Sequence, residues 1–260
     1  MRKLALLAFA VATMLSCAPR ARVDAAGIRP IEVIAPVTFI ANRVVRPPVR
    51  NGESAPPLPM DPSLTTATSI FRSGVPAFFD AMTEADRFEI VPQVTVLAAE
   101  AYAAFPKLSG VNAGTASLAE GWRLVTPEDG KKIAALLDEL GADAALLTYW
   151  RFTLDSHTQG IGVDTAFPRI YMRAWLIDRT GKVIAEDEFD VRADNMIAIY
   201  GQRYDARVLA GLYSDPIETC AVRLVADLSN ARTDARAEKK KEGALDPVEP
   251  VVEPPKDHGG

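Results

Sequence analysis

The stretch that sets the fold runs from Gly141 to Val191 and reads GADAALLTYWRFTLDSHTQGIGVDTAFPRIYMRAWLIDRTGKVIAEDEFDV. It contains three strand-like runs separated by two turn signals. Successive side chains of a strand point to opposite faces, so the alternation of apolar and mixed residues predicts one buried face. On the first run that face carries Leu146, Thr148, Trp150, Phe152 and Leu154. The stretch therefore predicts an antiparallel meander.

The opposite face of the predicted meander combines aromatic and arginine side chains. Its members on the first two runs are Tyr149, Arg151, Tyr171, Arg173 and Trp175. Because the cores of protein interfaces are enriched in Tyr, Trp and Arg, this face is a candidate interface. The alternative is that a second layer of helices covers the face and makes these residues part of the core. Glu186, Glu188 and Asp190 share one face of the third run and are expected near Arg169 and Arg173, with the register left open.

A helix is predicted immediately before the meander. Thr126 suits the N-cap, Pro127 suits the first helical position, and Gly141 suits the C-terminal position where a positive φ is common. Ile133, Leu136, Leu137 and Leu140 form its apolar stripe. We expect this helix to pack on the apolar face of the meander.

The first seventeen residues, MRKLALLAFAVATMLSC, have the pattern of a secretory signal. A basic start precedes an apolar run that is too short to span a bilayer, and the run ends at Cys17. The ending Met14-Leu15-Ser16-Cys17 is similar to the bacterial lipobox, although Leu is usual where Met14 stands. We therefore expect residues 1–16 to be a signal peptide and Cys17 to be lipidated, with an ordinary signal peptide as the alternative. Ala18 favours the outer membrane.

The rest of the chain predicts one α/β domain over residues 30–230, between a lipidated tether at 17–29 and a disordered, charged and Pro-rich tail at 231–260. Strands are expected at 31–40, with Pro36 at an edge or a bulge, and at 88–91. Helices are expected from Asp61, over 92–105 and from Asp215. This order predicts a single three-layer-like sandwich, with a mixed sheet of about five strands, a C-terminal antiparallel meander and covering helices.

Composition and side-chain supply argue against several kinds of function. The formal net charge of −5 is opposite to that of a typical nucleic-acid-binding protein. The chain has only two histidines, and His157 has no second histidine at a metal-ligand spacing. Cys220 lies on a predicted apolar helix stripe, where a buried inert thiol is expected. We therefore expect no catalytic residue, no metal and no cofactor.

The order of elements resembles a known group of bacterial proteins. A lipobox precedes a strand, a helix, the short strand FEIV (88–91), and a helix whose joint to the next strand reads Gly-Ala-Asp-Ala (141–144). The hairpin Ile-Asp-Arg-Thr-Gly-Lys-Val-Ile (177–184) closes the pattern. It is similar to periplasmic outer-membrane lipoproteins related to the curli-secretion lipoprotein and to the lipoprotein activators of penicillin-binding proteins. That resemblance implies an accessory, assembly or pore-forming role, and it carries over no catalytic residue.

The sequence thus predicts a lipid-anchored, periplasm-facing accessory protein of the bacterial outer membrane. It is expected to bind another envelope protein or a second copy of itself, and to have no enzymatic activity. One alternative is an oligomeric secretion or pore-forming subunit, which requires lipid-spanning hairpins of about ten residues per strand. A hydrolase is the other alternative, and the shortage of histidine argues against it.

Overall fold

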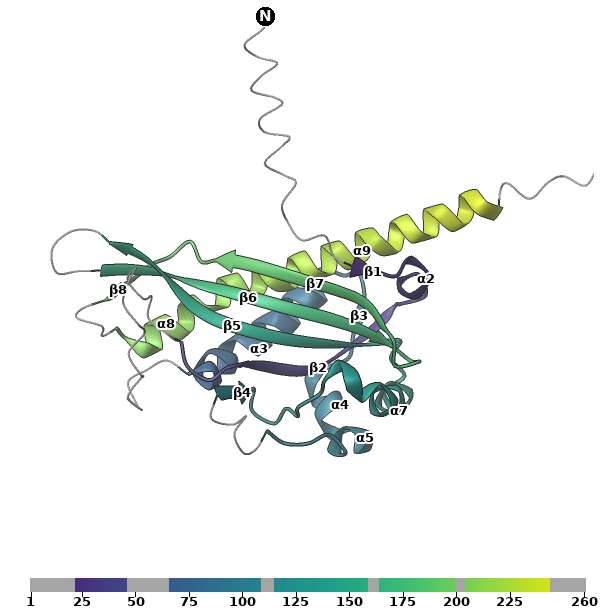
Figure 1. The fold of residues 1–260 in the computed structure, drawn as a ribbon, viewed down its shortest axis with the longest axis horizontal. Helices are drawn as coiled ribbons and strands as arrows, with labels where there is room; N and C mark the ends of the chain where they lie inside the picture. The colour runs from purple at the N-terminus through teal and green to yellow at the C-terminus, as the bar shows by residue number, and fades with distance from the viewer. Residues whose placement is uncertain (1–21, 46–65, 109–114, 159–163, 200–203, 244–260) are drawn as a thin grey trace, which may run out of the picture.

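A long hairpin dominates the structure. The computed structural model describes residues 22–45, 66–108, 115–158, 164–199 and 204–243, so the signal segment and Cys17 lie outside the described residues. Strands β5 (Ala144–Thr158) and β6 (Asp164–Asp178) have 15 residues each and pair antiparallel along their whole length. Strand β7 (Val183–Arg192) pairs antiparallel with β6 (Figure 1). The predicted antiparallel meander is confirmed.

The described residues form one mixed sheet of eight strands, in which the main path runs β1-β7-β6-β5-β2-β3. Strand β2 (Val33–Asn42) is parallel to both β3 (Glu89–Ile90) and β5. Strand β4 (Ala116–Leu118) pairs with β2, β8 (Ile197–Ile199) pairs with β6, and β1 (Arg22–Val23) pairs with β7. The mixed α/β class is confirmed, whereas about five strands was too few because strands of two or three residues carry no readable alternation.

Strand β2 contains the expected irregularity. Its register with β5 shifts between Pro36 and Thr38, which places Pro36 at a bulge. A proline has no N–H to donate to a sheet ladder, so a bulge inside a sheet accommodates it. One of the two positions expected for Pro36 is therefore observed.

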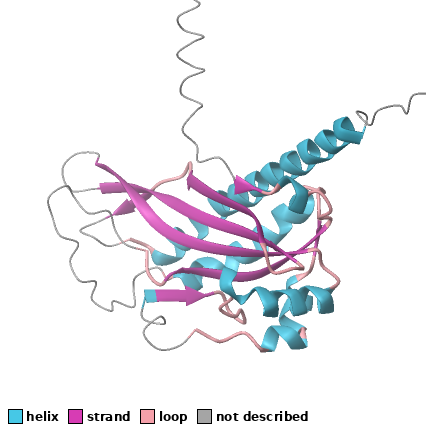
Figure 2. Cartoon of the chain, turned by 45° about the vertical axis from the view of Figure 1, so that its right-hand side comes forward, coloured by secondary structure: helices cyan, strands magenta, loops and turns pink. Residues whose placement is uncertain are grey.

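One face of the sheet is covered by helices α3 (Ala67–Glu84) and α9 (Ser214–Gly243), which pack against each other (Figures 1 and 2). The short helices α2 (Ala25–Ile28) and α8 (Ala206–Leu212) contact α9. A Cβ atom on Gly74 of α3 would lie 2.3 Å from the Cδ1 atom of Ile217 of α9. Glycine at this position therefore permits the close approach of the two helices.

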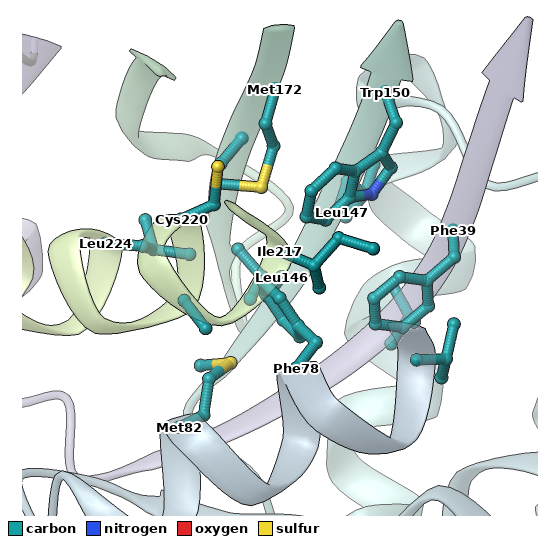
Figure 3. Close-up of a cluster of buried hydrophobic side chains, with 14 of the residues drawn as sticks. Phe39, Phe78, Met82, Leu146, Leu147, Trp150, Met172, Ile217, Cys220 and Leu224 are labelled. Carbon is teal, nitrogen blue, oxygen red and sulfur yellow. The ribbon is translucent and has the colours of Figure 1, made fainter. Parts of the chain in front are cut away.

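The core lies between this helical layer and the apolar face of the meander (Figure 3). Phe78 of α3 meets Trp150 of β5 edge to face at 5.6 Å between ring centroids, and meets Phe39 of β2 at 5.3 Å. The indole N–H of Trp150 donates to the hydroxyl of Thr148 over 2.8 Å, and that hydroxyl donates to the carbonyl of Thr38 over 2.9 Å. The Trp150 indole and the Thr148 hydroxyl are thus satisfied internally, as burial requires, whereas the buried indole N–H of Trp122 has no hydrogen-bond partner in the described structure.

The predicted helix before the meander is present but packs elsewhere. It consists of the 3-10 turn η1 (Pro127–Asp129) with a Thr126–Asp129 capping box, then α7 (Gly130–Leu140), which ends at Gly141 with φ 65°. Helix α7 packs against β5, β6 and α5 (Glu100–Ala103), away from the α3 and α9 layer. The expectation that it covers the apolar face of the meander is wrong, because α3 and α9 occupy that face.

The third layer of the expected sandwich is only partial. Ala145 and Leu147, which point away from α3 and α9, are buried at the end of β5 where α7 packs. Farther along the strand on the same face, Tyr149 and Arg151 are exposed. The meander is thus covered on both faces at one end and on one face over its middle (Figure 1).

The described structure differs from the expected boundaries in three places. Residues 22–28, expected in the tether, contain β1 and α2. The helix expected over 92–105 is two short helices, α4 (Gln93–Ala98) and α5, because Ala99 adopts an extended conformation with ψ 136°. Helix α9 continues to Gly243, past the expected tail boundary at 230.

Tertiary contacts hold the last turns of α9, although their composition alone is typical of disorder. The Arg232 guanidinium donates to the carbonyls of Ile31 and Arg87, each over 2.8 Å. The Ala235 side chain is buried, and its carbonyl accepts from Arg29. These partners are distant in sequence, so the composition of residues 231–243 does not reveal them.

The joint between α7 and β5 is tied to the start of β2 by one carboxylate. Asp143 Oδ2 accepts from the backbone N–H groups of Glu32 and Val33, both over 3.0 Å, and its own N–H donates to the Val33 carbonyl over 2.9 Å. Arg179 of the β6–β7 turn forms an ion pair with Asp143 over 3.4 Å. One side chain therefore connects three segments of the sheet.

We expect Asp143→Ala to lower the free energy of unfolding by roughly 1–3 kcal/mol, because two backbone donors lose a charged acceptor. Asp143→Asn is the matched control: it retains an acceptor oxygen and should lose less than half as much. Chemical denaturation of both variants measures the effect. Equal losses in the two variants would contradict the role given to the acceptor oxygen.

Candidate functional site

The candidate site is the open face of the meander, called here the arginine–aromatic face. It consists of Tyr149, Arg151, Tyr171, Arg173 and Trp175. The register of β5 with β6 places Arg151 directly opposite Tyr171, and Tyr149 opposite Arg173. Directly opposed side chains of neighbouring strands interact, so residues 20 positions or more apart in the sequence form one surface.

Arginine side chains lie over the aromatic rings of this face. The Arg151 guanidinium carbon is 4.2 Å from the centroid of the Tyr171 ring, and that of Arg169 is 4.9 Å from the same ring. Arg173 lies 4.9 Å from the Trp175 ring. Stacking of this kind contributes about 0.5–1 kcal/mol at exposed sites and orders long side chains.

Acidic side chains of β7 and β5 orient two of the arginines. Arg169 donates from Nε and Nη2 to the two carboxylate oxygens of Asp190, both over 2.6 Å, and also pairs with Asp155 over 3.0 Å. The hydrogen bonds to Asp190 are the largest of the effects that raise the pKa of Arg169. Arg173 pairs with Glu186, and with Glu188 over 3.4 Å. The expected proximity of the β7 acids to these arginines is therefore observed.

Arg151 differs from its neighbours in its charge environment. Among the residues that the structure describes, no carboxylate lies within ion-pair distance of its guanidinium. Glu186, Glu188 and Asp190 lie on β7, whereas Arg151 lies on β5 and has no carboxylate partner among the described residues.

The face remains accessible to solvent over the middle of the meander. Tyr149 is 41% exposed, Arg151 and Arg173 are exposed, and Tyr171 and Trp175 are half-buried. Figures 1 and 2 show the helices α3 and α9 on the other side of the sheet. No helix of the described structure covers the middle of this face, so these five residues are not part of the core. The alternative of a second helical layer is wrong.

Sequence reasoning missed two participants of the site. Asp155 was not connected with Arg169, because their pairing depends on the β5–β6 register, in which Thr153 lies opposite Arg169. The burial of Asp187 was not predicted, although this residue lies on the face toward α9 and is only 9% exposed. The alternation of β7 itself carried this signal, since Asp187 falls between Glu186 and Glu188.

Other titratable and nucleophilic groups have different environments. Cys220 is fully buried in the core, and burial raises the pKa of its thiol to about 12, as expected for an inert structural cysteine. His157 lies in β5 at the position opposite Thr165. Within the described ranges, no three His, Cys, Asp or Glu side chains converge on a point that would hold a metal ion.

None of the helices in the described part of the chain combines the length and the apolar character needed to cross a bilayer.

Comparisons with known proteins give a distant likeness to solved structures. No family model matches the chain, and no curated protein matches it significantly. The chain is similar to the lipoprotein GNA1162 from Neisseria meningitidis with 14% identity and a TM-score of 0.30, over 74% of this chain and 99% of that one. It is also similar to the hypothetical protein CT253 from Chlamydia trachomatis with 12% identity and a TM-score of 0.32, over 76% and 98%. At this level of similarity, neither likeness assigns a function to this chain.

The buried carboxyl of Asp187 predicts a pH dependence of stability. Burial is the largest cause that raises its pKa from 3.8 to about 6; the Glu188 N–H opposes this shift, and the charges of Asp227 and Glu188 add to it. A carboxyl whose pKa is higher in the folded state contributes stability below pH 3.8, and loses that contribution as the pH rises through about 6.

We therefore expect Asp187→Asn to be more stable than the parent chain at pH 7, by on the order of 1–2 kcal/mol. The difference should shrink as the pH falls from 7 to 4, because the parent then gains a proton in the folded state. Thermal unfolding at a series of pH values checks this, with the exposed Asp194→Asn as the control. A constant difference across the series would contradict it.

Proposed function

We propose that this chain is a lipid-anchored, periplasm-facing accessory protein of the bacterial outer membrane that binds another envelope protein through the arginine–aromatic face. In this proposal the protein has no catalytic activity of its own. The observation that carries the proposal is the exposed surface of Tyr, Trp and Arg on a rigid sheet, with no helix over its middle in the described structure.

The composition of the face supports protein binding. Tyr, Trp and Arg dominate the residues whose truncation costs most in protein complexes. Tyr and Trp bury a large area with only two rotatable side-chain bonds, and Arg adds several hydrogen-bond donors. Here they project from β5 and β6, which pair over 15 positions and hold the side chains at fixed spacing. A site on regular strands is positioned more accurately than one on loops.

The ordering of the arginines supports it further. Arg169 and Arg173 are held by carboxylates, and Arg151 stacks on Tyr171. Immobilising a long side chain on binding costs about 0.5–1.5 kcal/mol, so side chains that are ordered beforehand lose less. A matching partner surface would place a carboxylate opposite Arg151 and cationic groups opposite the β7 acids.

The anchor in this proposal is the lipobox at Met14-Leu15-Ser16-Cys17. Several acyl chains on one residue give firm membrane attachment, whereas a single chain binds only marginally. The chain from Cys17 to Arg22, the first described residue, spans at most about 18 Å. The domain is then held next to the membrane, within reach of other envelope proteins.

Site-specific photo-crosslinking tests the face. A photoreactive phenylalanine analogue in place of Tyr149 should yield a discrete crosslinked species in cells. The same analogue in place of Val94, which is 73% exposed on α4, should yield little or none. Arg151→Ala should reduce the Tyr149 adduct at least tenfold, consistent with the loss of about 1.4 kcal/mol or more.

The mass of the adduct identifies the partner class. A species with a different protein supports the accessory role. A ladder built from this chain alone, with a ring-sized native assembly, would favour the alternative of a secretion or pore-forming subunit. Equal adducts at the two positions, or none at Tyr149, would contradict binding through the arginine–aromatic face.

Lipid anchoring is tested separately. We expect Cys17→Ala to move the protein from the membrane fraction to the soluble fraction, because the acyl chains have no attachment point. Cys220→Ala is the matched control and should remain membrane-bound. Persistence of Cys17→Ala in outer-membrane fractions would contradict the lipidation.

A further inference from the structure

An open hollow of about 770 Å³ lies where the end of β2, strand β4 and the start of α3 come together, and is called here the basic hollow. Its volume is within the range of small-molecule sites, roughly 300–1,000 Å³. It shares no residue with the arginine–aromatic face. Its wall contains three cations and three hydroxyl groups, which belong to Arg43, Lys107, Arg123, Thr66, Thr68 and Ser117.

The cations of the basic hollow have no acidic partner in the described part of the chain. No carboxylate there lies within ion-pair distance of Arg43, Lys107 or Arg123, and no Asp or Glu lines the hollow. On the arginine–aromatic face, in contrast, Arg169 and Arg173 are held by carboxylates. A hollow lined by charges of one sign concentrates ions of the opposite sign, so this one favours an anionic ligand.

The start of α3 adds backbone donors to the same place. The N-cap Thr66 accepts from the Ser69 N–H over 3.3 Å, and the Ala67 N–H donates to the Arg43 carbonyl over 3.0 Å. The Thr68 N–H has no partner among the described residues. The first N–H groups of a helix and its dipole both favour anions. Because Thr66 and Thr68 line the hollow, this effect adds to that of the three cations.

An unsatisfied donor in the wall is a second, independent observation. Among the residues that the structure describes, the indole nitrogen of Trp122 is the one buried side-chain nitrogen or oxygen without a hydrogen-bond partner. The Trp122 side chain is 4% exposed and lines the basic hollow. Buried donors without a partner are rare in folded proteins. A ligand oxygen bound at this wall would give the donor an acceptor.

Hydrogen bonds between distant segments hold the wall in place. The Arg123 carbonyl accepts from the Thr38 hydroxyl over 2.8 Å, and the Arg123 N–H donates to the Tyr102 hydroxyl over 2.8 Å. The Arg123 guanidinium also donates to the Phe105 carbonyl over 3.1 Å. Ser117 lies in β4, which pairs with β2. Groups that are ordered before a ligand arrives lose less conformational freedom on binding.

We propose that the basic hollow binds a small molecule that carries a phosphate monoester on a hydroxyl-rich body. A phosphate monoester has a charge of about −1.5 to −2 at pH 7 and three strong acceptor oxygens. Arginine and lysine side chains form charge-assisted hydrogen bonds to phosphate. The hydroxyls of Thr66, Thr68 and Ser117 both donate and accept, which suits hydroxyl groups on the ligand. A soluble ester and a lipid head group both present this chemistry.

The arrangement of donors favours phosphate over carboxylate. The donors belong to the end of β2, the start of α3 and the segment 107–123, so a ligand between them meets donors from more than one direction. The three oxygens of a phosphate monoester can accept from several directions, whereas a carboxylate has two oxygens in one plane. This site does not depend on the proposed accessory function, which uses a different surface.

Titration calorimetry of the purified protein tests the site, with glycerol 3-phosphate as the probe in a low-salt buffer at pH 7. We expect saturable binding of one molecule per chain and none of glycerol. Malonate, which carries its charge on two carboxylates, should bind at least tenfold more weakly. Equal affinity for malonate would overturn the preference for phosphate. Absence of saturation by both glycerol 3-phosphate and inorganic phosphate at millimolar concentrations would overturn the site.

Removal of single charges locates the binding. Lys107→Gln and Arg43→Gln should each weaken the binding of glycerol 3-phosphate at least tenfold, because each removes a charge-assisted hydrogen bond. Lys239→Gln, on the last turns of α9 at the other end of the molecule, removes the same charge and should bind like the parent (Figure 1). Thermal unfolding without ligand checks that the variants are folded. Equal losses in all three variants would indicate unspecific attraction and overturn the proposal.

The indole N–H resonances of the three tryptophans give a second measurement. The Trp122 resonance should shift during the titration with the same midpoint as the heat. The Trp150 indole donates to the Thr148 hydroxyl in the core, so its resonance is the internal control and should stay in place. Saturation of the heat with an unchanged Trp122 resonance would place the ligand elsewhere and overturn the proposal.

A soluble lipid distinguishes the two sources of the phosphate. Dihexanoyl phosphatidic acid carries the glycerol 3-phosphate group with two short acyl chains. Similar affinities for the two compounds would support a soluble ester as the ligand. Binding of the lipid that is at least tenfold tighter, and that Lys107→Gln weakens, would support a lipid head group. Tight binding of the lipid that persists in Lys107→Gln would indicate recognition of the acyl chains and overturn the proposal.

Discussion

The alternation of side chains along the β5–β6 hairpin is the constraint on which the rest of the structure depends. Each strand has 15 residues, and every second residue must leave water together with its neighbours across the sheet. Helices α3 and α9 bury the apolar side chains of one face, where Phe78 packs against Trp150 and Phe39. The same alternation sends the intervening Tyr149, Arg151 and their partners to the opposite face. The core and the candidate interface therefore have one origin.

The long strands also determine how the site is ordered. Because β6 pairs antiparallel with both β5 and β7, carboxylates of β7 lie beside arginines of β6, and those arginines lie over aromatic rings. Exposed ion pairs contribute little to the free energy of unfolding, with a median of about 0–1 kcal/mol. Their effect here is to hold Arg169 and Arg173 in fixed positions. This ordering of the side chains supports the proposed binding role.

The ends of the sheet are controlled by contacts distant in sequence. Asp143 connects the end of α7 to the start of β2 and to the β6–β7 turn, and Arg232 attaches the last part of α9 to the body. On the outer side of β7, strand β1 pairs with Glu186 and Ala185 only, among the residues that the structure describes.

The sequence alone determined the three-stranded meander, the mixed α/β class and the five residues of the arginine–aromatic face, and it limited Pro36 to an edge or a bulge. These features depend on local periodicity and on special residues such as Pro127 and Gly141. Tertiary structure alone decided that α3 and α9, and not α7, cover the apolar face, that three further short strands complete the sheet, and that α9 continues to Gly243. The physical reason is that alternation predicts which side chains of the sheet are buried, but several amphipathic helices of the chain could cover them equally well. Only the summed packing of distant segments selects among them.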